Sequence, residues 1–352
     1  MALVRSVPVG FRTLSVRARQ AAILWGSIPI ASAAHAAPLQ YLSGAGEKAA
    51  PVVGLTWGVL GISVAVIVIV GLLLTGAIWH RPGRALAVGQ RAALERDQGG
   101  LNWLWIGVGL STLALLFTLV WTVKVLADIQ APPAKPAVTI EVTGRQWWWQ
   151  VRYIAGDTDR SFVTANEIHI PAGVPVRLKL VGGDVIHSFW VPQLAGKMDA
   201  IPGLTNETWI QAAAPGTYLG QCTEYCGLQH ARMGLRVIAQ APSDFRAWWA
   251  HELAAPAEPQ SASAQAGARQ FQSHCGGCHT VRGTDAAGAL GPDLSHLMQR
   301  RTIASGMLPN DAPDLAHWVA DPQGVKPGCL MPTPALSGDD LIHVTAYLRS
   351  LT

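Results

Sequence analysis

The chain has 352 residues, of which 50% are hydrophobic and 14% are charged, and its formal net charge is +4 at pH 7. This length has room for about two or three domains, and the composition is too apolar for an ordinary soluble enzyme, which predicts a membrane-embedded part. Because the positive charge is spread along the chain without a long run of Lys or Arg, nothing in the sequence indicates a nucleic-acid partner.

The N-terminal segment combines basic side chains with a short apolar run. The run AAILWGSIPIASAAHA ends in the small-residue pattern Ala34-His35-Ala36 and is preceded by Arg5, Arg12, Arg17 and Arg19. This arrangement predicts a cleaved secretory signal peptide over residues 1–36. A further transmembrane helix is the alternative, but the run is shorter than the roughly 20 residues that a bilayer requires, and Pro29 interrupts it.

Two longer stretches without a charged side chain follow, at residues 52–79 and 103–123. At about 1.5 Å per residue, the shorter one spans roughly 30 Å, the thickness of the hydrocarbon core of a bilayer. Both are predicted to be transmembrane helices, the second reaching to about residue 126, in a membrane hairpin over residues 37–130. The loop between them has four Arg against two acidic residues. The positive-inside rule therefore predicts a cytoplasmic loop, with both flanks of the hairpin facing outward.

An all-β domain is predicted after the Pro-rich segment ADIQAPPAKPA. Val138, Ile140 and Val142 alternate with more polar residues, as in a half-buried strand. Further strands are expected in VPVRLKLV, TWIQAAA and MGLRVIAQ, which Gly- and Pro-bearing turns separate, as in a Greek-key sandwich or barrel. Functional residues are then expected on loops at one end of a rigid β scaffold.

The segment QCTEYCGLQHARMG gathers thiols, an imidazole and a thioether within 14 residues, at Cys222, Cys226, His230 and Met233. A disulfide between the two cysteines is one interpretation. The full donor set instead favours copper over hard cations, and zinc seldom recruits Met. A mononuclear blue-copper site uses a single Cys, so two thiolates suit two bridged copper ions.

A second histidine is then needed, and the candidate is His187 in VIHSFWVPQLAGKMDAIPG, at a bend after the predicted strand VPVRLKLV. A histidine among apolar residues is ordinarily a satisfied core residue. The cysteine loop favours a ligand role for His187 instead.

These segments resemble subunit II of haem-copper cytochrome c oxidases, in the strings GRQWWWQVRY, DVIHSFWVPQLAGKMDAIPG and GTYLGQCTEYCGLQHARMGLRV. The resemblance implies a cupredoxin-like domain over residues 137–250 that carries a binuclear copper centre, CuA. The family motif falls on His187, Cys222, Glu224, Cys226, His230 and Met233.

Two further roles are implied by the resemblance alone. The backbone carbonyl of Glu224 would bind copper while its side chain faces a magnesium ion shared with subunit I. Trp147, the first of three consecutive tryptophans, would be the exposed point at which electrons enter, although core packing is the ordinary role of such residues. The chain departs from many relatives at GGLNWLW, where they carry a glutamate for proton uptake, so that role is not transferred.

The C-terminal part carries a second redox motif. Residues 251–265 are rich in Ala, Pro, Ser and Gln and are predicted to be a linker. The pattern CGGCHT then places Cys275, Cys278 and His279 in the C-x-x-C-H arrangement that attaches a c-type haem, with the histidine as axial ligand. A redox pair or half of a zinc site is disfavoured, because no second ligand pair follows.

A cytochrome c domain is therefore predicted over residues 266–352. Its sixth iron ligand could be Met298, Met307 or Met331. Met331 is predicted, because its Met-Pro pair resembles the axial methionine of class I cytochromes c. The segment LSGDDLIHVTAYLRSL has apolar residues at helical spacing after a cap-like Ser337, so it should form the closing helix. Cys329 is expected to be a buried structural thiol.

The chain is thus predicted to be a multidomain membrane protein: a two-helix transmembrane hairpin, an all-β cupredoxin-like domain and an all-α cytochrome c domain. The resemblance implies that it passes electrons from an external donor, cytochrome c or the cytochrome bc1 complex, through covalent haem c and CuA to subunit I and its companion membrane subunits. The globular domains would lie on the periplasmic side of a bacterial inner membrane.

Three other functions are compatible with parts of the sequence. A CuA-type nitric oxide reductase would use a similar subunit, and only its separate catalytic chain would distinguish it. A nitrous oxide reductase would require a large soluble domain before the copper motif, where the predicted membrane helices lie. A copper-delivery or carrier protein is disfavoured by the membrane hairpin and the haem motif.

Overall fold

The computed structural model describes residues 39–80, 100–155 and 160–352. Residues Leu39–Thr352 form one compact unit. The predicted signal peptide lies outside the described residues, and so does most of the predicted cytoplasmic loop.

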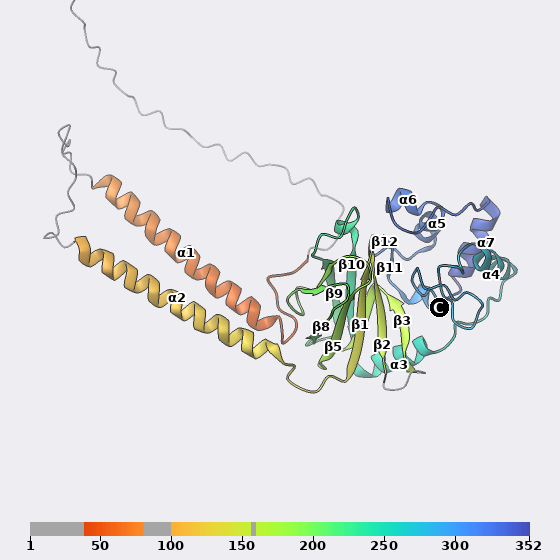
Figure 1. Cartoon of the computed structure of the whole chain (residues 1–352), viewed down its shortest axis with the longest axis horizontal. Coiled ribbons are helices and arrows are strands. Elements are labelled where there is room, and N and C mark those ends of the chain that lie inside the picture. Colours follow the sequence, from red (N-terminus) through yellow and green to blue (C-terminus); the bar gives the residue numbers. More distant parts are fainter. Residues whose placement is uncertain (1–38, 81–99, 156–159) are drawn as a thin grey trace, which may run out of the picture. The chain divides into compact units, whose positions relative to one another are not determined.

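Two long helices, α1 (Ala50–Trp79) and α2 (Gly100–Gln130), run side by side (Figure 1). By length and composition both could cross a membrane. They are somewhat longer than predicted, and the apolar stretches lie within them. At their contact a Cβ on Gly58 would collide with the Trp121 ring, so a larger residue there would displace that indole.

The next part of the chain, named the β-domain here (residues 138–240), is built from two five-stranded sheets. The first sheet has the order β3-β2-β1-β5-β8, with β1 Val138–Arg145, β2 Trp148–Ile154, β3 Phe162–Ala165, β5 Val176–Gly182 and β8 Thr205–Ile210. The second has the order β4-β10-β9-β6-β7, with β4 Glu167–Pro171, β6 His187–Trp190, β7 Met198–Ala200, β9 Gly216–Cys222 and β10 Gly234–Gln240. The pairs β1–β5 and β4–β10 are parallel and the other neighbours are antiparallel. This order requires the crossovers that a Greek-key prediction implies.

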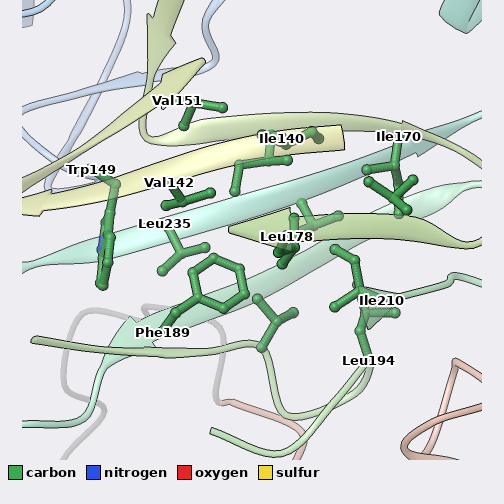
Figure 2. Packing of buried hydrophobic residues seen from close by; sticks show 14 of the residues in the cluster. Ile140, Val142, Trp149, Val151, Ile170, Leu178, Phe189, Leu194, Ile210 and Leu235 are labelled. Atoms are coloured by element: carbon green, nitrogen blue, oxygen red, sulfur yellow. The ribbon is translucent and has the colours of Figure 1, made fainter. Parts of the chain in front are cut away.

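Apolar side chains from both sheets meet in one core (Figure 2). The predicted alternation in β1 is confirmed: Ile140 and Val142 are fully buried, and Val138 is half-buried. They face Leu178, Phe189 and other side chains of the core cluster. Each such buried aliphatic side chain contributes roughly 1.5–3 kcal/mol to folding. The core makes the rigid frame on which the loops of the β-domain are mounted.

One predicted strand is shorter than expected. The stretch TWIQAAA was predicted as a strand, but β8 ends at Ile210. After Ile210 the backbone makes hydrogen bonds to loop residues instead of to a neighbouring strand. Ala212 accepts a hydrogen bond from the Gly173 N–H, and Ala213 donates to the carbonyl of Ala45.

The C-terminal part, named the helical domain here (residues 262–352), follows helix α3 (Pro242–Leu253). Its helices are α4 (Ala262–His274), α5 (Ala312–Ala320), α6 (Pro322–Val325) and α7 (Gly338–Leu348). Short strands β11 (Thr302–Ile303) and β12 (Leu308–Pro309) form a small hairpin, and a 3-10 turn occurs at Leu297–Gln299. Another 3-10 turn, His230–Arg232, lies in the β-domain between β9 and β10.

The predicted linker over residues 251–265 is wrong in its extent. Helix α3 continues to Leu253 and α4 already begins at Ala262, where the side chain of Ser261 accepts a hydrogen bond from the Ala264 N–H at 3.1 Å. The buried face of α4 consists of Ala264, Gly267 and Phe271, which is too small and sparse to be recognised as an apolar stripe.

The closing helix is confirmed as α7. Ser337 caps it by accepting a hydrogen bond from the Asp340 N–H at 3.1 Å. Its apolar face packs against α4, where the rings of Phe271 and Tyr347 lie 5.4 Å apart. The two helices and the hairpin enclose a second hydrophobic core, separate from that of the β-domain.

Candidate functional site

The loop between β9 and β10 brings the two cysteines together. The Sγ atoms of Cys222 and Cys226 lie 3.8 Å apart, and both cysteines are free, so they form no disulfide. Cys222 is the last residue of β9, and Met233 directly precedes β10. The antiparallel pairing of these two strands therefore places both ends of the loop at the same end of the second sheet.

Each thiol has its own imidazole. Cys222 Sγ lies 3.9 Å from His187 Nδ1, and Cys226 Sγ lies 3.6 Å from His230 Nδ1. The Met233 Sδ is 3.9 Å from Cys226 Sγ. The ligand atoms of His187, Cys222 and Cys226 all lie within 4.8 Å of one another, and all three residues are buried.

The backbone carbonyl of Glu224 completes this group, because its oxygen lies 3.4 Å from Cys222 Sγ. All six ligands expected from the sequence are thus adjacent. The donor set consists of two thiols and two imidazoles, with a carbonyl beside one thiol and a thioether beside the other. This set fits two copper ions. The side chain of Glu224 is only half-buried.

Asp184 is a partner of the site that sequence reasoning missed. Its Oδ1 lies 2.8 Å from His187 Nε2, while its carboxylate also accepts hydrogen bonds from the backbone N–H groups of Gln146 and Val185, both at 2.6 Å. A carboxylate on the far nitrogen of a metal-binding histidine fixes the ring and its tautomer. The spacing D-x-x-H within one bend was the available signal.

These contacts shift the pKa of each group. Burial disfavours the charged ring of His187, but the hydrogen bonds to Asp184 and then Cys222 outweigh it and raise the pKa to about 9. Burial likewise opposes ionisation of Asp184, whereas hydrogen bonds from His187, Gln146 and Val185 lower its pKa overall. The pKa of the Cys222 thiol is lowered, first by the hydrogen bond from Cys226 and further by His187. The paired Cys226 thiol has a raised pKa for the same reason, with burial adding to it.

Trp147 is not exposed, contrary to the prediction. Only 8% of it is accessible, because the helical domain covers it. Its Nε1–H donates to the carbonyl of Cys226 at 2.9 Å. Its own carbonyl accepts from Lys326 Nζ at 2.6 Å and from Ser305 Oγ at 2.8 Å. Burial lowers the pKa of Lys326 to about 7.

A cavity of about 520 Å³ opens on the other side of Trp147, within the size range of small-molecule and cofactor sites. Cys275, Cys278 and His279 line it, and so does Met331. The other two candidate methionines, Met298 and Met307, are absent from the described lining. The remaining wall is mostly apolar and includes Phe271, Leu297, Leu315, Trp318, Val344 and Leu348.

The histidine of the C-x-x-C-H motif is oriented by its neighbours. His279 Nδ1 lies 2.8 Å from the carbonyl of Pro292 and donates to it, which leaves Nε2 as the free nitrogen. Gly291 permits this packing, because a Cβ there would lie 2.6 Å from the imidazole. The geometry and the apolar wall fit a haem attached at the two cysteines. Cys329, expected to be buried, is only half-buried, and the side chain of Gln323 contacts its sulfur at 3.3 Å.

The helical domain is docked on the β-domain through a buried carboxylate. Glu167 on β4 is 2% exposed, and its side chain accepts hydrogen bonds at 3.0 Å from the N–H groups of Arg301 and Thr302 and from the Thr302 hydroxyl. Gln229 Nε2 donates to the carbonyl of Pro327 at 2.6 Å. The second contact joins the helical domain to the loop of residues 222–233, named the copper-ligand loop here, within one compact unit.

Two protein families match the chain: cytochrome c oxidase subunit II, periplasmic domain, over residues 138–240, and cytochrome c over residues 264–352. A cytochrome c oxidase subunit 2 of Alkalihalophilus pseudofirmus is 41% identical over 216 residues, which are 61% of this chain and 61% of that relative. A cytochrome c oxidase subunit 2 of Bacillus sp. strain PS3 is 32% identical over 266 residues, which are 71% of this chain and 73% of the relative. The aligned part thus spans less than two thirds of the first of these relatives.

Among solved structures, the periplasmic domain of subunit II of cytochrome oxidase from Bradyrhizobium japonicum is similar to this chain. The sequence identity is 34% and the TM-score is 0.31, and the match covers 34% of this chain and 95% of that one.

Proposed function

Because this chain belongs to the cytochrome c oxidase subunit II family and so is a subunit of an oxidoreductase, we propose that it is the subunit through which electrons enter a respiratory haem-copper oxidase. An external donor, cytochrome c or the cytochrome bc1 complex, would reduce haem c in the helical domain. The electron would pass to a binuclear copper centre in the β-domain and then to subunit I, which reduces oxygen.

The position of Trp147 carries this proposal. Trp147 lines the cavity that contains the C-x-x-C-H motif, and its Nε1–H donates to the carbonyl of Cys226 at 2.9 Å. One residue therefore adjoins both candidate redox sites. Trp147 would receive electrons from the chain's own haem, rather than from a protein that docks on an exposed indole.

The residues of each site have distinct roles in this proposal. Haem c and copper, when bound, each take up and release single electrons. The thiolates of Cys222 and Cys226 and the imidazoles of His187 and His230 would hold the copper. The carbonyl of Glu224, 3.4 Å from Cys222 Sγ, and the thioether of Met233, 3.9 Å from Cys226 Sγ, would complete the donor set.

In the helical domain, Cys275 and Cys278 would hold the haem covalently, and His279 and Met331 would bind iron. A histidine and methionine pair raises the haem potential. The side chain of Glu224 would face a magnesium ion shared with subunit I. The helices α1 and α2 would anchor the chain in a bacterial inner membrane, with both domains on the periplasmic side and companion membrane subunits around subunit I.

The first test is the ratio of copper to iron in the full chain, purified with its haem attached. Two coppers per iron are expected. One copper would indicate a mononuclear site, and no copper after loading would leave the cysteine loop without the proposed role. Identification of the co-purifying catalytic chain then separates an oxygen reductase from a nitric oxide reductase.

The second test follows the electron. After rapid reduction of haem c, the copper centre should become reduced more slowly in Trp147→Leu than in the unchanged chain, while the copper and haem contents stay the same. Trp147→Phe keeps an aromatic ring but loses the N–H, so it reports how much the hydrogen bond to Cys226 contributes. Equal rates in all three proteins would contradict the path through Trp147.

A further inference from the structure

The cavity that contains the C-x-x-C-H motif is not formed by the helical domain alone. Part of its wall comes from the β-domain, at the end of β1, the start of β2 and nearby loops: Arg145, Gln146, Trp147, Trp148, Asn166 and Asp184. The hydrogen bonds from Lys326 and Ser305 to the carbonyl of Trp147 hold this wall against the helical domain. A haem in the cavity would therefore contact both domains.

The charges on the described cavity wall are mostly positive. Arg145, Arg300 and Lys326 face one carboxylate, that of Asp184. Asp184 already accepts three hydrogen bonds, from His187 and from two backbone N–H groups. Arginine stays charged at any pH that a folded protein tolerates. Neither guanidinium therefore has a carboxylate partner among the described wall residues, although Glu252, Asp293 and Glu167 attract Arg300 from outside the wall.

Each guanidinium also has an unused donor. The Nε atoms of Arg145 and Arg300 are buried and have no hydrogen-bond partner in the described structure. Arg300 is otherwise held by the protein, because its terminal nitrogen donates to the carbonyl of Asp293 and lies 3.3 Å from the Thr164 hydroxyl. A buried N–H on a charged group that bonds to nothing is destabilising. A bound group whose acceptor oxygens reached these guanidinium groups would relieve this.

Haem carries such oxygens, because two of its edge substituents are propionate carboxylates. Guanidinium is the side chain best suited to bind a carboxylate through two parallel hydrogen bonds. We propose that Arg145 of the β-domain binds a haem carboxylate together with Arg300 of the helical domain, so that the haem site is shared between the two domains. This inference rests on the proposed function only in placing haem in the cavity.

The consequence is electrostatic. A cation from the β-domain offsets the negative charge at the haem edge, so it favours the reduced iron and keeps the carboxylate ionised. In Arg145→Gln the haem potential should fall, because the uncompensated carboxylate favours the oxidised iron. The potential should also rise as the pH falls, because the carboxylate pKa is now raised and protonation removes its charge. Asp184, Arg300, Lys326, His274 and His279 line the same cavity in every variant, and Glu252, Asp293 and Glu167 act on Arg300 in every variant. Any pH slope that these groups cause, including that of Lys326 with its pKa of about 7, is therefore present in the unchanged chain as well.

The experiment measures the haem c midpoint potential against pH in the full chain. The matched control is Arg152→Gln, since Arg152 is an exposed residue of β2 that pairs with Glu141 on the sheet surface. A lower potential with a new pH slope in Arg145→Gln, absent from Arg152→Gln, is the expected result. A lower potential without a new slope would reflect lost charge alone and overturn the proposal, as would a profile that matches the control.

A conservative variant protects the test against a folding defect. If Arg145→Gln attaches no haem, Arg145→Lys takes its place, because it keeps the charge but cannot form two parallel hydrogen bonds. A haem potential that varies with pH less steeply than expected for Arg145→Gln, but more than in the unchanged chain, then supports the proposal. A dependence of potential on pH that equals that of the unchanged chain overturns it. Copper content is measured in the same samples. Absence of copper from the unchanged chain would contradict the proposed function, whereas the haem potential still decides the role of Arg145.

Discussion

Single residues around the two sulfur atoms decide how the metal is held. Asp184 should matter although it is not expected to touch copper, because its carboxylate is the partner of His187 Nε2. In Asp184→Asn we expect copper affinity to fall by about 10–100-fold, the usual effect of losing such an outer partner. Competition with a chelator measures it. Asp244→Asn, an exposed acid in α3, is the control, and equal affinities would contradict the role of Asp184.

The thioether of Met233 is a second residue to change. Met233 is fully buried, and Leu has a similar volume, so Met233→Leu should cost less than about 1.5 kcal/mol of stability. We expect an altered copper potential and absorption spectrum with haem c still attached. Met198→Leu, which is only half-buried on β7, should change neither. An unchanged copper potential in Met233→Leu would show that the sulfur is not a ligand.

Copper binding should also depend on pH through His187. Burial opposes the proton on this ring, but the hydrogen bonds to Asp184 and Cys222 outweigh it and hold the pKa at about 9. Copper must displace that proton, so below about pH 9 His187 should add a rise in affinity of up to about tenfold per pH unit to the rise that the Cys226 thiol, with its raised pKa, causes throughout. The slope of affinity against pH should therefore decrease above about pH 9, and in Asp184→Asn it should decrease at a lower pH. A slope that changes at the same pH in both proteins would exclude His187 as the cause.

At the level of structural elements, the turn after the haem motif must approach the His279 ring closely. A Cβ on Gly291 would lie 2.6 Å from that ring, so Gly291→Ala should displace the imidazole at a cost of about 1–3 kcal/mol. The expected result is a perturbed haem spectrum and a lower melting temperature. Gly338→Ala is the control, because a Cβ at the start of α7 would meet nothing within 4 Å. Identical spectra in both variants would show that the turn adjusts freely.

For the molecule as a whole, the docking of the helical domain on the β-domain depends on Glu167. Its buried carboxylate accepts hydrogen bonds from Arg301 and Thr302, so Glu167→Gln should weaken the docking by about 1–3 kcal/mol. We expect the two domains to unfold in separate steps and haem-to-copper transfer to slow. Glu258→Gln, exposed in the connection between α3 and α4, should leave both unchanged. A single cooperative transition in Glu167→Gln would contradict this view.

Much of the fold was predictable because its patterns are local. The apolar stretches are long enough to identify α1 and α2, and the alternation of Ile140 and Val142 identifies β1. The cap at Ser337 identifies α7. The predictions fell short where the local signal was weak: α4 has a buried face of small residues, and the stretch after Ile210 has strand-forming residues but no strand to pair with.

The chemistry of the site was also local in the sequence. The string C-x3-C-x3-H-x2-M specifies donor types that suit copper, and C-x-x-C-H specifies haem attachment, so both cofactors follow from residue type and spacing alone. Where His187 lies relative to the cysteines was not local, because β6 and β9 must pair before its Nδ1 comes within 3.9 Å of Cys222 Sγ. Its partner Asp184, by contrast, lies three residues before it, so the D-x-x-H spacing was a local signal.

What only the tertiary structure decided is how the two redox sites meet. The sequence describes two domains joined by a polar segment, and nothing in it says which surfaces touch. Docking through Glu167 buries Trp147, which sequence reasoning expected to be exposed, and makes it contact both the copper-ligand loop and the haem cavity. The physical reason is that residue type and spacing carry the chemistry of each site, whereas a contact between domains depends on surfaces assembled from distant segments.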